Sequence, residues 1–227
     1  NLTDPPETSN GHGHLRDVVY GAIDGSVTTF AIVAGVAGAG LSPFIILALG
    51  FANVLADGFS MAVGNYSGTK AEADDTARLR AIEARRIAQD PDAARAELRN
   101  ILSARGLSGT VLTQATSQIA SQPNLWLKTL LEGGHGLATQ GPDPKRAAIA
   151  TFIAFLAAGL IPLLPFVFGM SNAFPVSTAL TLATFFAIGA LKSVWSLAPW
   201  WRSGIETLLI GGMAAGIAYA VGMLFNH

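Results

Sequence analysis

Three acidic residues lie inside otherwise apolar stretches of the sequence. Asp17 and Asp24 stand seven residues apart in the first stretch, and Asp57 lies in the second. A charged carboxylate near the centre of a bilayer costs about 2.5 to 3.5 kcal/mol on insertion scales, so it persists where it faces protein, water or a cation. These acids are therefore candidates for binding a cation inside a membrane.

The second apolar stretch carries a polar stripe. Its polar side chains recur every four residues, which places them on one face of a helix: Asn53, Asp57, Met61 and Asn65. Carboxylate and amide oxygens suit divalent cations, and a thioether favours Fe(II), Mn(II) or later metals over Mg(II) and Ca(II). The stripe therefore predicts a divalent-metal site that also includes Asp24.

Each of these residues also has a purely structural interpretation. Asp24 and Asp57 can join two helices through a polar contact without binding an ion. Met61 can fill a gap in an apolar core. Asp17 lies two helical turns, about 10.5 Å, before Asp24, where it can pair with Arg16 or sit in interfacial water. The sequence leaves these alternatives open.

The composition is typical of a membrane protein. Hydrophobic residues make up 51% of the chain and charged residues 13%, whereas soluble domains carry about 25% charged residues. No alternation of the outer-membrane barrel type recurs, and about 20 apolar residues are enough for a helix to cross a bilayer. We therefore expect an all-α membrane protein with five transmembrane helices, at residues 17–40, 43–67, 147–169, 174–197 and 203–225. Pro162 and Pro165 should bend or end the third of them.

The chain between the second and third spans is polar and holds 20 of the 29 Asp, Glu, Lys and Arg residues. It predicts a small helical insert whose first helix continues the second span to about Gln89. A helix capped by Asp90 or Asp92 and two shorter helices should follow. The chain then has four segments: a disordered N-terminal lead at 1–15, two transmembrane helices at 16–67, the insert at 68–146, and three transmembrane helices at 147–227.

The basic residues predict the orientation in the membrane. Of the 14 Lys and Arg residues, 11 lie between Lys70 and Arg146, and the short connections near Leu41 and Met170 carry none. An excess of Lys and Arg marks the cytoplasmic side. We therefore expect the N-terminus and the insert in the cytoplasm and the C-terminus outside, with the bacterial inner membrane as the host.

Small residues predict where helices approach one another closely. Gly21-x-x-x-Gly25 lies in the first span and Gly212-x-x-x-Gly216 in the fifth. The second span carries a ridge of small residues at every fourth position: Ala52, Ala56, Ser60, Gly64 and Gly68. We expect all three patterns to mark tight helix contacts.

Composition and motifs also exclude several functions. A net charge of -1 provides no basic surface for nucleic acid. The absence of cysteine removes disulfides and thiolate chemistry. No His lies within a predicted span, so a dyad of Asp24 and Asp57 is the one protease arrangement left. Phosphate-binding glycine loops and zinc-protease motifs are also missing, so we expect neither an enzyme nor a permanently bound cofactor.

Several stretches, in the right order along the chain, resemble the vacuolar iron transporter family. They are RDVVYGAIDG from Arg16, SMAVGNYSGTKAE from Ser60, GL at Gly106, QP-x-x-WL from Gln122, GPDPKRA from Gly141 and LIPLLPF from Leu160. The resemblance implies a dimer of five-helix subunits that exchanges cytosolic Fe(II), and often Mn(II), for protons. It also implies a path at the subunit interface and a helical metal-binding domain in the cytoplasm.

By this resemblance, Asp17 and Asp24 fall on the two acids of the family's first helix, and Met61 falls on its second-helix methionine. The family's glutamate eight residues before that methionine is Asn53 here. Asp57 stands one turn further along, where the family pattern has a small residue. The acid has thus moved along one helical face, and because Asn53 cannot titrate, Asp24 or Asp57 must carry any proton.

The insert departs further from the family pattern. Glu83 and Glu97 match two of its metal-binding glutamates, whereas two others are Arg86 and Ala94 here. Taken without the resemblance, Glu83 and Glu97 are typical of solvated helix charges. We therefore expect a weak, single-metal or vestigial site in the insert.

Two further family ligands, a methionine and a glutamate before the Pro-Asp-Pro turn, are Leu130 and Gly134 in this chain. Glu132 and His135 stand nearby and could replace them, because a carboxylate with an imidazole suits Fe(II) or Zn(II). The alternative is that both are surface residues beside a glycine-rich turn.

We therefore expect a homodimeric exporter of Fe(II), with Mn(II) and Zn(II) as further substrates, that exchanges metal for protons across a lipid membrane. The path lies either within one bundle or at the seam between two copies. The alternatives are a membrane metal sensor or assembly scaffold without flux, and an intramembrane aspartyl protease. The candidate metal ligands are Asp24, Asp57, Met61, Asn53, Asp17, Glu83, Glu97, Glu132 and His135.

Overall fold

A computed structural model of the chain describes residues 9–137, 141–193 and 199–226. These residues form helices and their connections, and no strand occurs among them. The all-α fold class is therefore confirmed. The chain divides into two compact units, one of residues 1–67 with 142–227 and the other of residues 68–141, and each unit has its own architecture. The second covers most of the predicted insert, whose cytoplasmic location stays a prediction.

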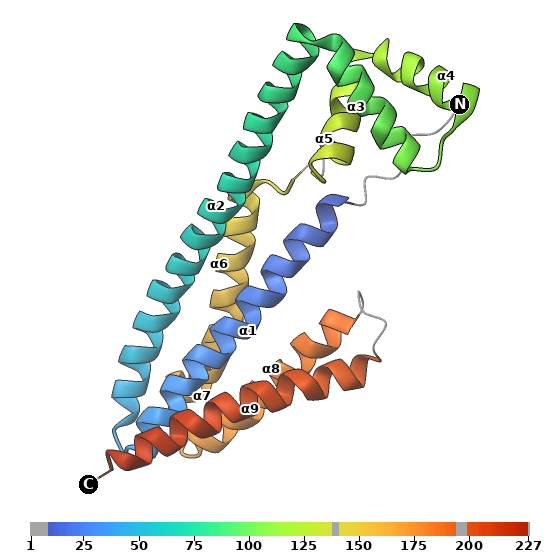
Figure 1. The fold of residues 1–227 in the computed structure, drawn as a ribbon. Coiled ribbons are helices and arrows are strands. Elements are labelled where there is room, and N and C mark those ends of the chain that lie inside the picture. Colours follow the sequence, from blue (N-terminus) through green and yellow to red (C-terminus); the bar gives the residue numbers. More distant parts are fainter. Residues whose placement is uncertain (1–8, 138–140, 194–198, 227) are drawn as a thin grey trace. The chain divides into compact units, whose positions relative to one another are not determined.

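The first unit contains the membrane-spanning helices (Figure 1). Its elements are α1 (Ser9–Gly38), the first half of α2 (Pro43–Gln89), α6 (Pro144–Leu160), a 3-10 turn η1 (Ile161–Leu163), α7 (Leu164–Val167), α8 (Ala173–Lys192) and α9 (Trp200–Leu224). Among the described residues, five helical segments are long and apolar enough to cross a membrane: Leu15–Gly38, Pro43–Gln89, Pro144–Val167, Ala173–Lys192 and Trp200–Leu224. The five predicted spans are confirmed, apart from residues 194–197 of the fourth, which lie outside the described residues.

The first two helices are longer than the membrane spans predicted within them. Helix α1 begins at Ser9, so the part of the expected disordered lead from Ser9 to Leu15 is helical, and residues 1–8 lie outside the described residues. No proline occurs between Ser9 and Leu15 to prevent this extension. Helix α2 runs unbroken through 47 residues to Gln89, as the uninterrupted helical composition predicts.

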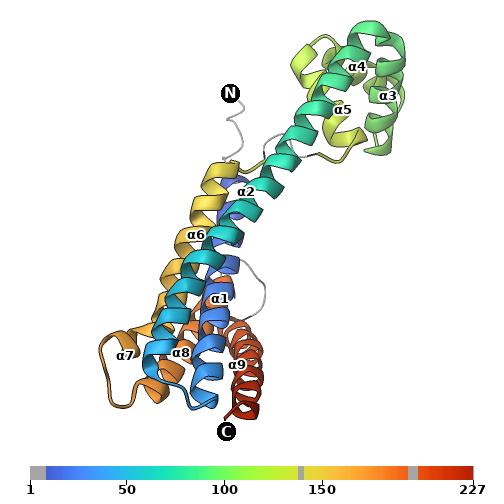
Figure 2. The ribbon, with the colours of Figure 1, turned by 90° about the vertical axis from the view of Figure 1, so that its left-hand side faces the viewer.

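Glycines allow the backbones of α1 and α6 to touch (Figure 2). A Cβ atom at Gly21 would lie 2.6 Å from the Thr151 carbonyl oxygen, and one at Gly25 would collide with the Phe155 carbonyl oxygen. The predicted role of Gly21-x-x-x-Gly25 in close packing is therefore confirmed. Helix α1 also packs against α8 and α9, which makes it the central helix of this unit.

The two glycines predicted to pack in the fifth span, Gly212 and Gly216, are not the ones that contact another helix. A Cβ atom at Gly212 or Gly216 would meet nothing within 4 Å. The contacts are made instead by Gly211, which lies against the Phe185 ring, and by Gly222, which lies against the Gly35 backbone. Spacing alone identifies a small-residue face but not which of two adjacent faces meets a neighbour.

Helix α2 turns two different faces to its surroundings. Its polar stripe is half-buried, and Gly50 and Gly58 lie against side chains of η1 and α6. The small-residue ridge beside the stripe is exposed: Ala52, Ala56, Ser60, Gly64 and Gly68. A Cβ atom at Gly64 would meet nothing within 4 Å, so the ridge makes no tight contact within one copy of the described chain.

The apolar side chains of this unit divide between a core and a surface. Phe30 and Val33 of α1, Val54 of α2 and Leu163 of η1 form part of one buried cluster. Large apolar side chains also cover the outer surface, with Phe59, for example, 66% exposed. A contiguous apolar surface of this kind is typical of contact with lipid or with another protein chain.

The ends of α6 follow from the local sequence. At its start, Asp143 accepts a hydrogen bond of 2.9 Å from the Arg146 backbone N–H, the usual arrangement of a helix N-cap. This bond holds the pKa of Asp143 below its ordinary value of 3.8. At its other end the helix stops at Leu160, and a 3-10 turn and a short helix carry the predicted breaks at Pro162 and Pro165.

The second unit contains the end of α2 and three shorter helices, α3 (Pro91–Ala104), α4 (Gly109–Ala120) and α5 (Pro123–Gly134). Asp90 caps α3 by accepting a hydrogen bond from the Ala93 backbone N–H at 3.0 Å, and Gly106 adopts a φ of 94° just after its end. The core joins Leu98 of α3 to Trp126 of α5. The predicted helices of the insert are present.

The contact between α1 and α6 predicts the effect of filling it. Gly21→Ala should lower the melting temperature of the purified protein, because the added methyl forces the two backbones apart at a cost of about 1 to 3 kcal/mol. Gly212→Ala is the matched control, since its methyl enters open space and should leave the melting temperature unchanged or raised. Equal melting temperatures for the two variants would contradict the packing.

The Asp143 cap predicts a pH-dependent contribution to stability. Its pKa is lowered in the folded state, so its contribution is complete above the ordinary value of 3.8 and is lost as the pH falls below that value. Asp143→Ala should lower the melting temperature at pH 7, whereas Asp143→Ser, which keeps a capping oxygen, should retain most of it. The difference in melting temperature between wild type and Asp143→Ala should become smaller below pH 3.8.

Candidate functional site

Asp17 is the first of the predicted acids along α1. It is only 5% exposed, and its Oδ1 lies 3.9 Å from Arg16 Nη2, whose side chain is exposed. Of the two alternatives for Asp17, this contact favours the pairing with Arg16. The residue lies one turn before Gly21, on the face of α1 that packs against α6, which explains its burial, and the pairing with Arg16 is present.

Asp24 and Asp57 come together from different helices. Both are half-buried, and their carboxyl groups lie close enough to interact electrostatically. Among the residues that the structure describes, no Lys or Arg forms an ion pair with either. The pair therefore places two like charges near each other without a fixed positive charge to balance them.

The polar stripe of α2 is oriented toward the other helices of its unit. Asn65 donates hydrogen bonds from Nδ2 to Thr151 Oγ1 at 2.7 Å and to the Ala147 carbonyl oxygen at 3.3 Å. Met61 and Asn53 lie one and three turns away along the same face and are half-buried. The stripe is thus a continuous polar face that meets α6 at one end.

Three buried polar groups of this unit have no hydrogen-bond partner within the described residues: Ser26 Oγ, Thr29 Oγ1 and Asn53 Nδ2. Thr29 and Val54 both lie beside Gly159 of α6, so α1, α2 and α6 meet there. A buried polar group without a partner costs about 1 to 3 kcal/mol. The membrane unit thus keeps three buried polar groups unsatisfied in this structure, one of them, Thr29 Oγ1, at the point where the three helices meet.

Sequence reasoning missed Ser26, Thr29 and Thr151. The signal was available, because each is a hydroxyl residue inside an apolar span. Hydroxyl residues are common in such spans, however, since they bond to the backbone four residues earlier, as Thr28 does to the Asp24 carbonyl oxygen. Only the structure separates hydroxyls used in this way from those left unsatisfied.

No group of three or more His, Cys, Asp or Glu side chains within the described parts of the chain is arranged to hold a metal ion. The predicted site in the spans does not need such a group, because it combines two carboxylates with an amide and a thioether. The predicted metal site in the insert does need such a group of three or more side chains, because its candidate ligands are all Glu or His: Glu83, Glu97, Glu132 and His135.

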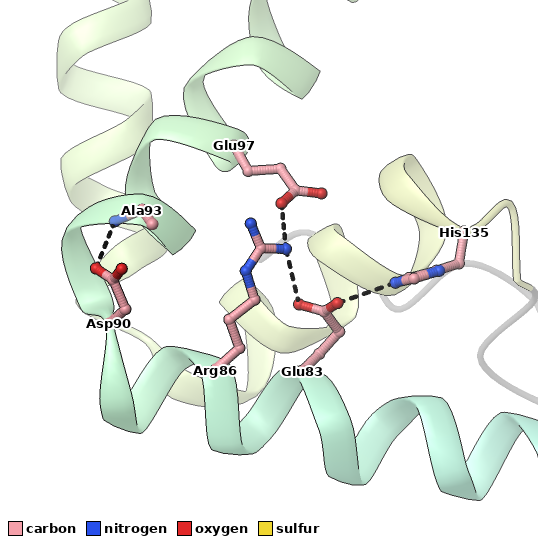
Figure 3. Close-up of polar contacts among 6 residues, drawn as sticks. All are labelled: Glu83, Arg86, Asp90, Ala93, Glu97 and His135. Atoms are coloured by element: carbon pink, nitrogen blue, oxygen red, sulfur yellow. Dashed lines mark hydrogen bonds and ion pairs between the residues drawn. The ribbon is translucent and has the colours of Figure 1, made fainter.

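The insert brings three of those four residues together around an arginine (Figure 3). Glu83 Oε1 lies 3.0 Å from His135 Nε2, and Glu83 Oε2 lies 3.7 Å from Arg86 Nη1. The same Arg86 nitrogen also forms a close ion pair with Glu97. At 4% exposure Glu83 is buried, so the interpretation of Glu83 as a solvated helix charge is wrong. Its carboxylate lies against Arg86 and against His135, the residue that follows the end of α5.

Glu132 lies on α5 and pairs with a lysine of the same helix. Its Oε1 lies 3.8 Å from Lys128 Nζ, one turn earlier on α5, and both side chains are well exposed. A contact of this length between exposed charges contributes little, typically 0 to about 1 kcal/mol. His135 is exposed beside the glycine-rich turn, as the surface interpretation predicts, but its ring also contacts the buried Glu83 carboxylate.

The five apolar helices and the acids within them define the class of protein as an all-α integral membrane protein. The chain belongs to the VIT family, whose model matches residues 15–223. The resemblance carried by its sequence stretches is therefore confirmed.

Several curated relatives cover most of the chain. It is 34% identical over 212 residues to vacuolar iron transporter 1 of Eucalyptus grandis, covering 91% of this chain and 84% of the relative. It is 33% identical over 218 residues to vacuolar iron transporter 1 of Arabidopsis thaliana, covering 94% and 86%. A vacuolar iron transporter of Toxoplasma gondii is 29% identical over 231 residues, covering 96% and 76%. All three relatives are named as transporters and not as enzymes.

Proposed function

We propose that this protein transports Fe(II), with Mn(II) as a further substrate, out of the cytosol in exchange for protons. Relatives named as iron transporters over more than nine-tenths of the chain support the substrate. The observation that carries the mechanism is the electrostatic interaction between Asp24 and Asp57 across two apolar helices. Two like charges without a fixed partner are stabilised by a mobile cation.

The ligand set explains the choice of metal. Asp24 and Asp57 supply two negative charges, and the Asn53 carbonyl oxygen adds a neutral donor while its Nδ2 remains unsatisfied. Met61, on the same face of α2, supplies a soft thioether that favours Fe(II) and Mn(II) over Mg(II) and Ca(II). Asp17, buried near the start of the span Leu15–Gly38, receives or releases the ion.

The same carboxylates account for the exchange with protons. A proton neutralises one carboxylate, whereas a divalent metal balances both, so the two ions compete for one site. Protons entering from the acidic side displace the metal, and the metal displaces protons on the neutral side. With the N-terminus and the insert in the cytoplasm, as the distribution of Lys and Arg favours, metal leaves the cytosol.

A metal sensor without flux is the remaining alternative, and the contacts of the insert weigh against it. A sensor needs ligands that are free to bind its metal, but Arg86 engages both Glu83 and Glu97. Three buried polar groups without a hydrogen-bond partner lie within the spans, where a transported ion would pass, whereas the one carboxylate oxygen of this kind in the insert, Glu83 Oε2, lies beside Arg86. A protease acting through Asp24 and Asp57 predicts peptide cleavage in place of flux.

Transport can be tested in liposomes with an acidic interior. Wild type should take up Fe(II) and Mn(II), and abolishing the pH gradient should reduce uptake strongly. Asp57→Asn should lower the rate tenfold or more, the factor given by about 1.4 kcal/mol of lost metal binding, because it removes a charged ligand. Full uptake by Asp57→Asn would contradict the site.

The control for this experiment is Asp75→Asn. Asp75 is also an acid of α2, but it is exposed in the insert and pairs with Arg78 at 3.0 Å. The Asp75→Asn variant should take up metal at the same rate as wild type. Uptake that does not respond to the pH gradient in wild type would exclude proton exchange while leaving metal transport in place.

The exposed ridge of α2 supports a homodimer with the path at its seam. The ridge lies beside the half-buried polar stripe, so a second copy packed on it would cover the stripe. Small residues allow close contact between helices in a membrane, and the ridge makes no tight contact within one copy of the described chain.

The chain contains no cysteine, so single cysteines report this interface cleanly. Gly64→Cys should form a disulfide-linked dimer in membranes upon mild oxidation, because residue 64 of one copy would face the ridge of the other. Met213→Cys, at an exposed position on α9, is the control and should stay monomeric. A disulfide-linked dimer of Met213→Cys but not of Gly64→Cys would show that the interface lies on α9 instead.

A further inference from the structure

We propose that Arg86 is the built-in cation of the insert, so that its guanidinium takes the place of a metal ion between Glu83 and Glu97. The insert is then held together without metal. Figure 3 shows Arg86 of α2 reaching both carboxylates, with His135 on the other side of Glu83. This inference concerns the insert alone and stands whether or not the protein carries Fe(II).

The burial of Glu83 makes a positive partner necessary. A carboxylate that is 4% exposed loses most of its hydration, which costs several kcal/mol unless charge or hydrogen bonds replace it. His135 contacts Oε1 at 3.0 Å. Oε2 has no hydrogen bond among the described residues, so the Arg86 charge at 3.7 Å is its remaining compensation.

Glu97 shows that three helices meet at this point. It extends from α3 to Arg86 of α2, and a Cβ atom at Gly134 of α5 would lie 3.1 Å from its Oε1. Any side chain at residue 134 would therefore crowd the Glu97 carboxylate. The glycine at residue 134 thus leaves room for the Glu97 carboxylate beside α5.

A divalent metal does not fit this arrangement. Its oxygen and nitrogen ligands must converge on one point at about 2.0 to 2.6 Å, and the space between the carboxylates is occupied by the guanidinium. The charge of Arg86 would also repel a metal. Since arginine keeps its proton at any physiological pH, this block is permanent and does not vary with metal concentration.

Arg86 is accordingly a positioning residue that fixes α3 and α5 against α2. A ligand that comes and goes would switch the insert between ordered and loosened states. A covalently attached cation cannot leave, so the insert should stay in one ordered state whether the metal concentration is low or high.

The first test counts bound Mn(II) on the full-length protein in detergent by equilibrium dialysis. Glu83→Gln should bind as many Mn(II) ions as wild type, because Glu83 is not a metal ligand. Any ions bound in the membrane unit are counted equally in both proteins, so they do not affect the difference in the number of bound ions. Loss of one bound ion in Glu83→Gln would overturn the proposal.

The second test follows hydrogen–deuterium exchange of peptides from α3 and α5 in the full-length protein. Arg86→Met should speed their exchange by roughly tenfold or more, because it leaves a buried carboxylate without its cation. Arg78→Met, which removes an exposed partner of Asp75, is the matched control and should leave exchange unchanged. Treating wild type with a chelator should also have no effect.

Two outcomes of the exchange experiment overturn the proposal. Faster exchange of wild type in chelator would show that a metal orders the insert. Unchanged exchange in Arg86→Met would show that the guanidinium contributes nothing to it. Either result leaves the transport proposal untouched, because neither variant changes a residue of the membrane unit.

Discussion

Like-charge repulsion between two carboxylates in an apolar environment is the constraint on which the membrane unit depends. Asp24 and Asp57 interact electrostatically, and the repulsion between like charges grows several-fold as the surroundings become less polar than water. Nothing in the described helices supplies a fixed counter-charge to this pair. The rest of the unit therefore has to hold two mutually repelling groups in place, and it does so through contacts that do not involve them. Gly21 and Gly25 bring α1 against α6, and Asn65 attaches α2 to the same helix through Thr151.

Small residues perform two separable tasks in this arrangement. Those of α1 face inward and set the distance between helical backbones. This contact fixes the position of the acids on neighbouring turns of α1. Those of α2 at Ala56, Ser60 and Gly64 face outward and leave a smooth ridge next to the polar stripe. A helix with a polar face half-covered on one side and a close-packing ridge on the other is suited to a second copy. The fold of one chain thus explains why a path would be completed between two.

Much of this organisation was predictable from the sequence, because it depends on local rules. The spans follow from hydropathy, the helix starts at Asp90 and Asp143 from capping, and the break after Leu160 from two prolines. What could not be predicted depends on which side of a helix meets a neighbour. Gly212 and Gly211 are adjacent in sequence, yet only Gly211 makes a contact. Glu83 looks like a surface charge in the sequence because the residue that contacts it, His135, lies 52 residues further along the chain, just after the end of α5.

The two pairs of acids in this chain face the same electrostatic problem and have different countercharges. In the insert, Glu83 and Glu97 share a guanidinium on the same polypeptide, which orders three helices but excludes exchange with any other cation. In the spans, Asp24 and Asp57 have no arginine or lysine partner among the described residues, and under the proposed function their countercharge arrives from solution and can leave again. A fixed cation makes a structural site, whereas a transport site requires its absence. The resemblance alone would treat both pairs as metal ligands; the position of Arg86 is the observation that supports a mobile cation in the membrane unit and a permanent one in the insert, as we propose.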